Sequence, residues 1–345
     1  MGRWIVSARF DLAIFLFSSA VTLVPWLAVG RFGVAPYYIL AAVAIASNGP
    51  HLVSTWTRVY MDGRERFRRP LHYYLIPSLI VCGVLAFLLI DGRDSPWLRT
   101  VLFYWASWHF MAQCWGLLRI YQRKHGVAGL PIAKVEKALL FGGASWCVLH
   151  RIFTGPWTLF AIPIWHPRLP AWFVNLFGAA VLGTAVFYII LRIAEWRRSD
   201  KVPELRRPAM IASTVFAFAV PFILIKDGTA AFAAAACWHG IQYLGIVWFY
   251  NRNRYQEGID PRARLMSWVS QKGRWPFYFI VLLVIAALAY LSIKGLSRLT
   301  VDTTWDLNTW ALFVWTSLTF THYWLDGVIW KLRKDRTLSA RLQAA

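Results

Sequence analysis

Apolar stretches of about 20 residues recur along the whole chain, and their length constrains the fold more than any other feature of the sequence. A helix of this length spans roughly 30 Å, which is the thickness of the hydrocarbon core of a bilayer. The ranges with this character are 10–29, 36–57, 72–90, 98–118, 138–155, 171–191, 208–225, 229–251, 275–293 and 308–330. We therefore predict an all-α fold, a polytopic transmembrane helical bundle of about ten spans that forms a single transmembrane domain over residues 1–345.

The composition excludes an ordinary soluble domain. Hydrophobic residues make up 58% of the 345 residues and charged residues only 15%, which is more apolar surface than a soluble domain of this size can bury. The 21 tryptophans and 14 tyrosines are typical of rings that lie at the two membrane interfaces.

The distribution of basic residues separates two explanations of the net charge of +21, which are nucleic-acid binding and membrane topology. When the predicted spans are laid out, most of the 37 lysines and arginines, from Arg3 to Arg341, fall on one side of the membrane. The other side carries only Arg31, Arg93, Arg99, Arg151, Arg168, Lys226, Lys294 and Arg298. This positive-inside pattern predicts a multi-pass protein of the bacterial inner (cytoplasmic) membrane with both termini in the cytoplasm. It also predicts contacts with anionic membrane lipids and no nucleic-acid partner.

Four of the eight histidines lie within predicted spans and away from the membrane surfaces, and they are His51, His109, His239 and His322; His72 and His150 lie near span ends. The charge pattern makes all four of these spans run from outside to inside, so that cytoplasmic basic residues follow each histidine. At 1.5 Å per residue, the histidines lie roughly 10–20 Å above the cytoplasmic helix ends. We therefore expect them to share one layer of the membrane.

Each of these histidines has polar residues three or four positions away, on the same helix face. The residues that follow them at this spacing are Thr55, Gln113, Gln242, Tyr243 and Asp326. Unsatisfied polar groups in hydrocarbon cost several kcal/mol, so these polar faces should meet inside the bundle. Imidazole is the commonest metal-binding side chain, and an all-imidazole site suits iron, copper or zinc better than magnesium or calcium.

These residues predict a buried transition-metal site, with iron as the favoured metal. The predicted ligands are His51, His109, His239 and His322. The candidate catalytic residues, which orient the imidazoles or move protons, are Asp326, Tyr243, Gln113 and Gln242. The function that this site predicts is oxidative chemistry on a lipophilic small molecule that enters from the bilayer.

Short segments around the four histidines resemble an uncharacterised bacterial family of multi-span membrane proteins. These segments are NGPHLVSTW (48–56), SWHFMAQCWG (107–116), CWHGIQYLGIVWFYNRNR (237–254) and THYWLDGVIWK (321–331). With GPH at 49–51 and HF at 109–110, they also distantly resemble the bacterial Brp/Blh β-carotene 15,15′-dioxygenases. In that family, single histidines on separate spans hold one iron for oxidative cleavage of a carotenoid. The resemblance implies a four-histidine metal site. It does not imply the substrate, because this chain has more spans and reads HLVST where the family has an HGALD-like stretch.

The sequence leaves other functions open. The polar layer is also compatible with a proton-coupled transporter or channel, with a haem protein that uses two facing histidines, and with a scaffold subunit whose histidines only pack. Asp326 is compatible with a metal ligand, a second-layer acceptor, a proton relay or an ion pair with Lys331. Motifs of other enzyme classes, such as GxSxG, the P-loop, HExxH and GxGxxG, are absent from the sequence.

Overall fold

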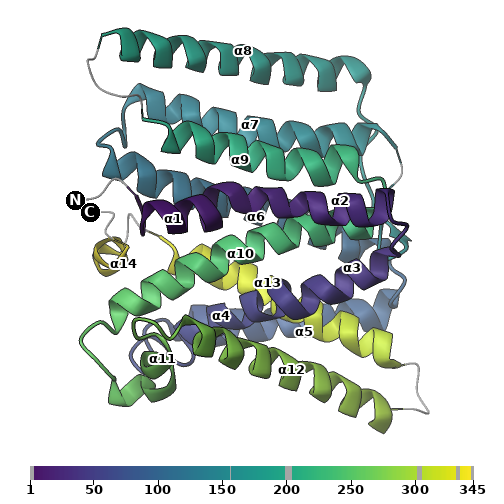
Figure 1. Ribbon diagram of the computed structural model, residues 1–345. Helices are drawn as coiled ribbons and strands as arrows, with labels where there is room; N and C mark the ends of the chain where they lie inside the picture. Colours follow the sequence, from purple (N-terminus) through teal and green to yellow (C-terminus); the bar gives the residue numbers. More distant parts are fainter. Residues whose placement is uncertain (1–3, 156, 199–203, 301–304, 332–334, 343–345) are drawn as a thin grey trace. The chain divides into compact units, whose positions relative to one another are not determined.

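A computed structural model describes residues 4–155, 157–198, 204–300, 305–331 and 335–342 of the chain (Figure 1). Of these residues 79% are helical, and the one sheet among them is a two-stranded hairpin, which confirms the predicted all-α fold. The cations Arg3, Lys201, Arg333 and Lys334, which contribute to the predicted charge pattern, lie outside the described residues.

Every predicted span coincides with a helical segment. The N-terminal segments are α1 Ala8–Phe10, η1 Asp11–Leu16, η2 Phe17–Thr22 and α2 Leu23–Gly30, then α3 Pro36–Val43, η3 Ala44–Asn48 and α4 Gly49–Val59, then η4 Leu71–Leu75 and α5 Ile76–Asp91. The central segments are α6 Pro96–Lys124, α7 Pro131–Phe153, α8 Ala171–Arg197, α9 Arg206–Ala219 with η5 Val220–Leu224, and α10 Gly228–Arg254. The C-terminal segments are α12 Trp275–Leu299 and α13 Leu307–Ile329. Shorter elements are the strands β1 Thr158–Leu159 and β2 Ile162–Pro163 and the helices η6 Pro261–Ala263, α11 Arg264–Val269 and α14 Arg336–Arg341.

Among the described residues, six helical segments are long and apolar enough to cross a membrane. They are Ala8–Gly30, Leu71–Asp91, Ala171–Arg197, Arg206–Leu224, Gly228–Arg254 and Trp275–Leu299. The segments that carry His51, His109 and His322 are not among the six, and polar side chains interrupt their apolar surfaces. The chain is therefore of the helical membrane type, while the count of ten spans and the cytoplasmic location of the termini stay predictions.

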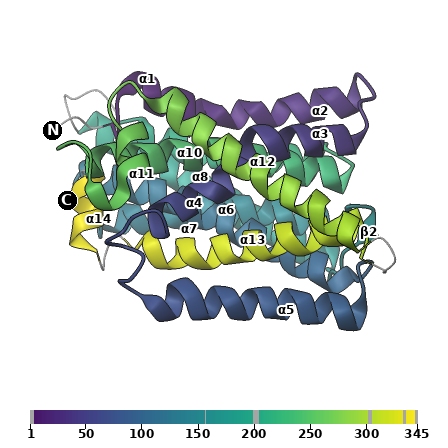
Figure 2. The ribbon, with the colours of Figure 1, turned by 90° about the horizontal axis from the view of Figure 1, so that it is seen from below.

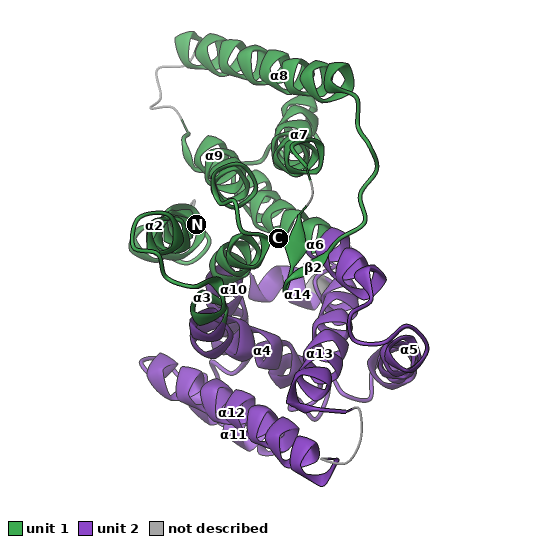
Figure 3. Cartoon of the chain, turned by 90° about the vertical axis from the view of Figure 1, so that its right-hand side faces the viewer, with its two compact units in different colours: residues 1–40, 107–239, 343–345 green, residues 41–106, 240–342 purple. Residues whose placement is uncertain are grey.

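The chain divides into two compact units (Figure 3). Unit 1 comprises residues 1–40, 107–239 and 343–345, and unit 2 comprises residues 41–106 and 240–342. Within unit 1, α7 packs against both α8 and α9. Within unit 2, α12 packs against α4 and α13, and α13 lies beside α5 (Figure 2). The prediction of a single domain over residues 1–345 stays a prediction.

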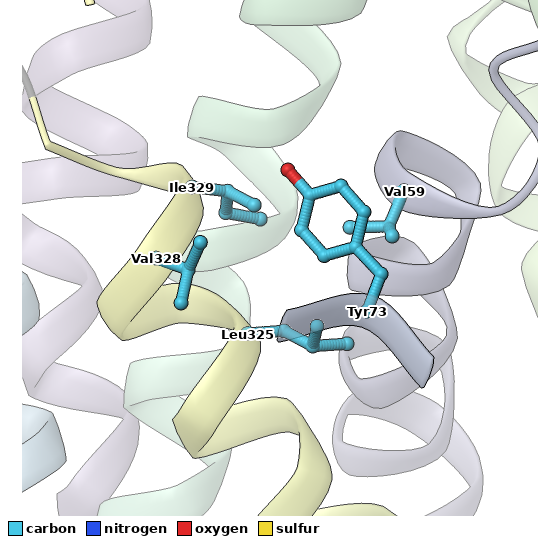
Figure 4. Close-up of a cluster of buried hydrophobic side chains, with 5 residues drawn as sticks. All are labelled: Val59, Tyr73, Leu325, Val328 and Ile329. Atoms are coloured by element: carbon cyan, nitrogen blue, oxygen red, sulfur yellow. The ribbon is translucent and has the colours of Figure 1, made fainter. Parts of the chain in front are cut away.

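A buried cluster in unit 2 fixes α4 relative to α13. The ring of Tyr73 lies between Val59 of α4 and three residues of α13, which are Leu325, Val328 and Ile329 (Figure 4). Tyr73 is fully buried, and its backbone carbonyl accepts a hydrogen bond of 2.6 Å from the Tyr60 hydroxyl. Because His51 and His322 lie on these same two helices, this packing also positions two of the four histidines.

The turn before α4 is a π-helix, η3, in which the Gly49 N–H bonds to the carbonyl of Ala44. A β-carbon at position 49 would lie 2.8 Å from that carbonyl oxygen and 3.1 Å from the β-carbon of Ala286. Only glycine fits this crossing of η3 with α12 without displacing a neighbour. The π-turn and Gly49 together set the rotation of α4 and hence the direction of His51.

The start of α13 is capped by Asp306, which lies just before the predicted span. Its carboxylate accepts hydrogen bonds from the backbone N–H and the hydroxyl of Thr309, at 2.9 and 2.8 Å. These two bonds, together with one from Arg93, lower the pKa of Asp306 to about 2. Such a cap satisfies backbone donors that the first helical turn leaves unbonded, so α13 begins at a defined residue.

Unit 1 contains a buried ionic network centred on Glu136, which is 0% exposed. The carboxylate accepts hydrogen bonds from Arg207 at 2.5 Å, from the Tyr188 hydroxyl at 3.0 Å and from Gln122 at 2.8 Å. Arg207, which is 2% exposed, also donates to Glu204 at 2.9 Å. The network joins α6, α7, α8 and α9 by charge-assisted bonds, which are stronger than neutral ones.

At the edge of this network, Glu204 lies 3.5 Å from the imidazole of His125. Burial lowers the pKa of His125, although bonding to the Tyr121 carbonyl and the charge of Glu204 act in the opposite direction. His125 is therefore neutral at physiological pH, and the ionic bonds of the network run between Glu136, Glu204 and Arg207.

The segment 155–170, whose prolines and tryptophans favour a re-entrant or interfacial stretch, contains the β1–β2 hairpin of unit 1. Its two-residue turn, Phe160–Ala161, has positive φ angles of 54° and 62°. Turns of this kind are normally made by Asn-Gly, and a residue with a β-carbon in this region costs roughly 1–2 kcal/mol. The hairpin is thus strained at its tip, and no strand is predicted here from the residue pattern.

Candidate metal centre

In unit 2, His51 of α4 and His322 of α13 form a buried pair. Their ring centroids are 4.3 Å apart with the planes at 83°, and the side chains are 2% and 0% exposed. The ring of Tyr243, which comes from α10, lies 4.8 Å from that of His51 and 5.2 Å from that of His322. Three helices therefore bring aromatic and imidazole rings to one buried place in this unit.

The hydroxyl of Thr55 connects the polar groups of this unit. Thr55 lies one helical turn after His51 and is 0% exposed. Its Oγ1 lies 2.7 Å from His322 Nδ1, 2.7 Å from the Tyr243 hydroxyl and 3.2 Å from Asp326 Oδ1. A single hydroxyl thus contacts an imidazole, a phenol and a carboxylate.

The bonds to Asp326 determine which way the protons of this network point. Tyr243 donates its hydroxyl hydrogen to Asp326 Oδ1 at 2.5 Å, and Thr55 donates to the same oxygen. With its hydrogen directed at Asp326, the Thr55 oxygen is able to accept a hydrogen from His322 Nδ1, which carries one in the Nδ1–H tautomer of the ring. This tautomer places the imidazole lone pair on Nε2, the nitrogen with which His322 would bind a metal.

Gly240 of α10 allows the chain around Ser47 and His51 to approach α10 closely. A β-carbon at Gly240 would collide with Oγ of Ser47 and lie 3.4 Å from the β-carbon of His51. Small residues at helix crossings are typical of membrane bundles, where close backbone approach is the main source of packing energy. Gly240 therefore contributes to the position of His51 without a polar group of its own.

In unit 1, His109 of α6 and His239 of α10 form a second buried pair. Their ring centroids are 4.8 Å apart with the planes at 70°, and the side chains are 6% and 1% exposed. The ring of Phe110 lies 4.4 Å from that of His239. Gln113 donates its amide to the backbone carbonyl of His239 at 3.1 Å, so this contact fixes the backbone of α10 rather than an imidazole.

All four predicted ligands belong to one group that is able to hold a metal ion. Each of His51, His109, His239 and His322 is buried and offers one nitrogen, and these four nitrogens lie within 4.8 Å of one another. Imidazole nitrogens are ligands that transition metals accept, so the donor set would suit a transition metal.

The other predicted site residues differ in which histidine they lie beside and in what they bond to. Asp326, which is 8% exposed, and Tyr243, which is 1% exposed, belong to the Thr55 network beside His322. Gln113 contacts the backbone of His239, and Gln242 is 0% exposed. The sequence places Thr55 on the same helix face as His51, but no role is predicted for it above. The signal that could have found its role is the spacing of four residues between His51 and Thr55.

Beyond Asp326, the polar face of unit 2 continues to a buried arginine. Trp330 donates its indole N–H to the Tyr243 hydroxyl at 3.2 Å, and its ring also packs on the guanidinium of Arg58 at 4.1 Å. The same guanidinium also packs on the ring of Tyr250 at 4.2 Å, and Nη2 donates to the carbonyl of Ile329 at 2.9 Å. Two cation–π contacts stabilise this buried guanidinium.

No family model matches this chain, and no curated protein and no solved structure matches it either. The class of this protein therefore follows from its own structure. It is a helical protein of the membrane type with a buried four-histidine cluster that is able to bind metal.

Proposed function

We propose that the chain is a metal-dependent protein of the bacterial inner membrane, and that it binds one transition metal, iron, for oxidative chemistry on a lipophilic substrate. The observation that carries this proposal is the convergence of His51, His109, His239 and His322, four buried imidazoles with their nitrogens within 4.8 Å. Burying four imidazoles close together in an apolar surrounding is costly, and a shared metal would give all four a common ligand role. The distant resemblance to the Brp/Blh dioxygenases supports iron as the metal.

Each part of the chain has a role in this proposal. Iron held by these imidazoles would supply the oxidative chemistry. Thr55 holds the Nδ1 hydrogen of His322 and so directs Nε2 to the metal. Tyr243 donates its hydroxyl hydrogen to Asp326 at 2.5 Å, and these two groups are the local source from which a proton would reach the site. Apolar helices suit a substrate that arrives from the bilayer, and the basic loops contact anionic lipid headgroups.

Metal analysis of the purified protein, together with its absorption spectrum, tests the proposal. We expect about one equivalent of a transition metal per chain, as in structural and catalytic metal sites, with iron predominant. A strong Soret band would instead identify haem held by two histidines. A preparation from iron-supplemented cells that contains no stoichiometric transition metal would contradict the proposal.

Replacing Thr55 by valine is expected to weaken metal binding by about 10–100-fold, the usual effect of losing a group that orients a metal-bound histidine. Valine keeps the shape of threonine but cannot accept from His322 Nδ1 or donate to Asp326. Competition with a chelator of known affinity measures the change. Thr55→Ser should retain the affinity of the unchanged protein.

Thr57→Val is the matched control, because Thr57 lies on the same helix, is 2% exposed and bonds to the Ser54 carbonyl instead. Equal metal affinity in Thr55→Val and Thr57→Val would show that Thr55 does not orient His322.

A further inference from the structure

The strained hairpin of unit 1 is held in place by the start of α10. The backbone N–H of Phe160 donates to Oγ1 of Thr229 at 3.0 Å. A β-carbon at Gly228 would collide with the carbonyl of Thr158 and the indole of Trp157, so the hairpin lies directly against the helix backbone. Trp157 is only 4% exposed. These contacts offset the strain of the turn and keep its tip at one position.

The side chain at this tip begins a row of aromatic rings that ends at the histidine pair of unit 1. The centroid of the Phe160 ring is 6.2 Å from that of Phe232, which is 6.3 Å from that of Phe110. Phe110 in turn lies 4.4 Å from His239. Phe232 and His239 are seven residues apart on α10, which places them on one helix face about 10 Å apart along the axis. The row therefore runs along α10 from the hairpin to the pair.

Phe160 combines a strained backbone with an aromatic side chain. Glycine at position 160 would adopt the positive φ angle without strain, but it would bring no ring to the row. The hairpin instead holds a phenylalanine in a backbone conformation that favours glycine. Strain of this kind persists where the surroundings over-determine it, and it is concentrated at clamps and gates.

We propose that Phe160 is a plug that closes an aromatic passage to His109 and His239, and that this passage admits an uncharged, apolar molecule. The proposal rests on the proposed function, since it names the route and the chemical class of the molecule that reaches the metal. The rings that form the row carry no charge and no hydrogen-bonding group, so a charged molecule would lose its hydration without compensation there. Displacement of the tip also releases the strain of the turn, which lowers the free energy of opening.

Site-resolved modification of histidine by diethylpyrocarbonate tests the plug without any bound metal. The full-length protein is stripped with a chelator and treated with the reagent, and the peptides of His109 and His239 are followed by mass spectrometry. Phe160→Ala is expected to raise their modification rate about tenfold, which corresponds to about 1.4 kcal/mol in the free energy of opening. Phe153→Ala is the matched control, because Phe153 ends α7 in the same unit and is 41% exposed.

Phe160→Gly separates loss of the ring from unfolding of the hairpin. Glycine suits the turn, so the hairpin keeps its shape, and we expect the same increase in modification as in Phe160→Ala. Ala161→Gly relieves strain but keeps the ring, and the two histidines should stay protected. Protection in Phe160→Gly equal to that of the unchanged protein would overturn the proposal.

A second measurement separates this proposal from that of the metal. In metal-loaded protein, Phe160→Gly should accelerate removal of the metal by 1,10-phenanthroline, which is uncharged and aromatic, more than removal by EDTA, which is charged. If modification rises while no variant binds metal, the passage stands and the proposed function fails. If metal binds while neither rate changes in Phe160→Gly, the plug is wrong and the metal site stands.

Discussion

Replacement of either histidine pair alone by alanine is expected to reduce bound metal to background. The two variants are His109→Ala with His239→Ala, and His51→Ala with His322→Ala. If the four imidazoles hold one ion, each double variant loses two of the four nitrogens, and the remaining pair binds too weakly to retain the metal through purification. Element analysis of the purified variants, normalised to protein, measures the effect.

This pair of variants also distinguishes one shared site from two separate ones. Were each pair to bind its own ion, each double variant would keep half of the metal content of the unchanged protein. His150→Ala serves as the matched control, because His150 lies on α7 outside the four-histidine group and its ring packs near Trp146. Full metal content in either double variant would exclude the proposed centre.

Replacing Glu136 by leucine is expected to destabilise the protein by roughly 3–5 kcal/mol, the cost of removing one member of a buried ion pair. The change leaves Arg207, which is 2% exposed, with only Glu204, and it removes the acceptor of Tyr188 and Gln122. Reversible unfolding in mixed micelles with increasing denaturing detergent gives the free energy of unfolding.

A double-mutant cycle shows where this cost arises. Glu136→Leu combined with Arg207→Leu removes both buried charges and should be markedly less destabilising than the sum of the two single changes. Glu195→Leu is the surface control, because its ion pair with Arg192 has a carboxylate side chain that is 58% exposed and is worth at most about 1 kcal/mol. A loss below about 1 kcal/mol in Glu136→Leu would mean that the network does not stabilise unit 1.

The positions of the four histidines could be predicted because they depend on quantities that the sequence contains. The charge alternation gives each span a direction, and the distance from His51 to the next basic residue, Arg58, gives a depth. The helical repeat then places Thr55 and Asp326 on the faces of His51 and His322, where the structure has them.

What could not be predicted depends on contacts between distant segments. Nothing local to Thr55 indicates that it bonds to His322 and Tyr243, and nothing local to Gln113 indicates that its amide donates to the backbone carbonyl of His239. The hairpin was missed because Phe160 and Ala161 are not turn-forming residues, and the start of α10 holds them in their strained conformation.

The π-helical turn Ala44–Asn48 gives the chain before His51 a tolerance to deletion that a regular helix lacks. Such a turn holds one more residue than an α-helical turn, so removal of a single codon here would convert it to α-helix. The residues on either side would keep their faces, because the turn loses only its extra residue, and His51 would keep its direction. A one-codon deletion within the regular helix α3 would instead rotate His51 by about 100° relative to the part of α3 before the deletion, although no histidine had changed.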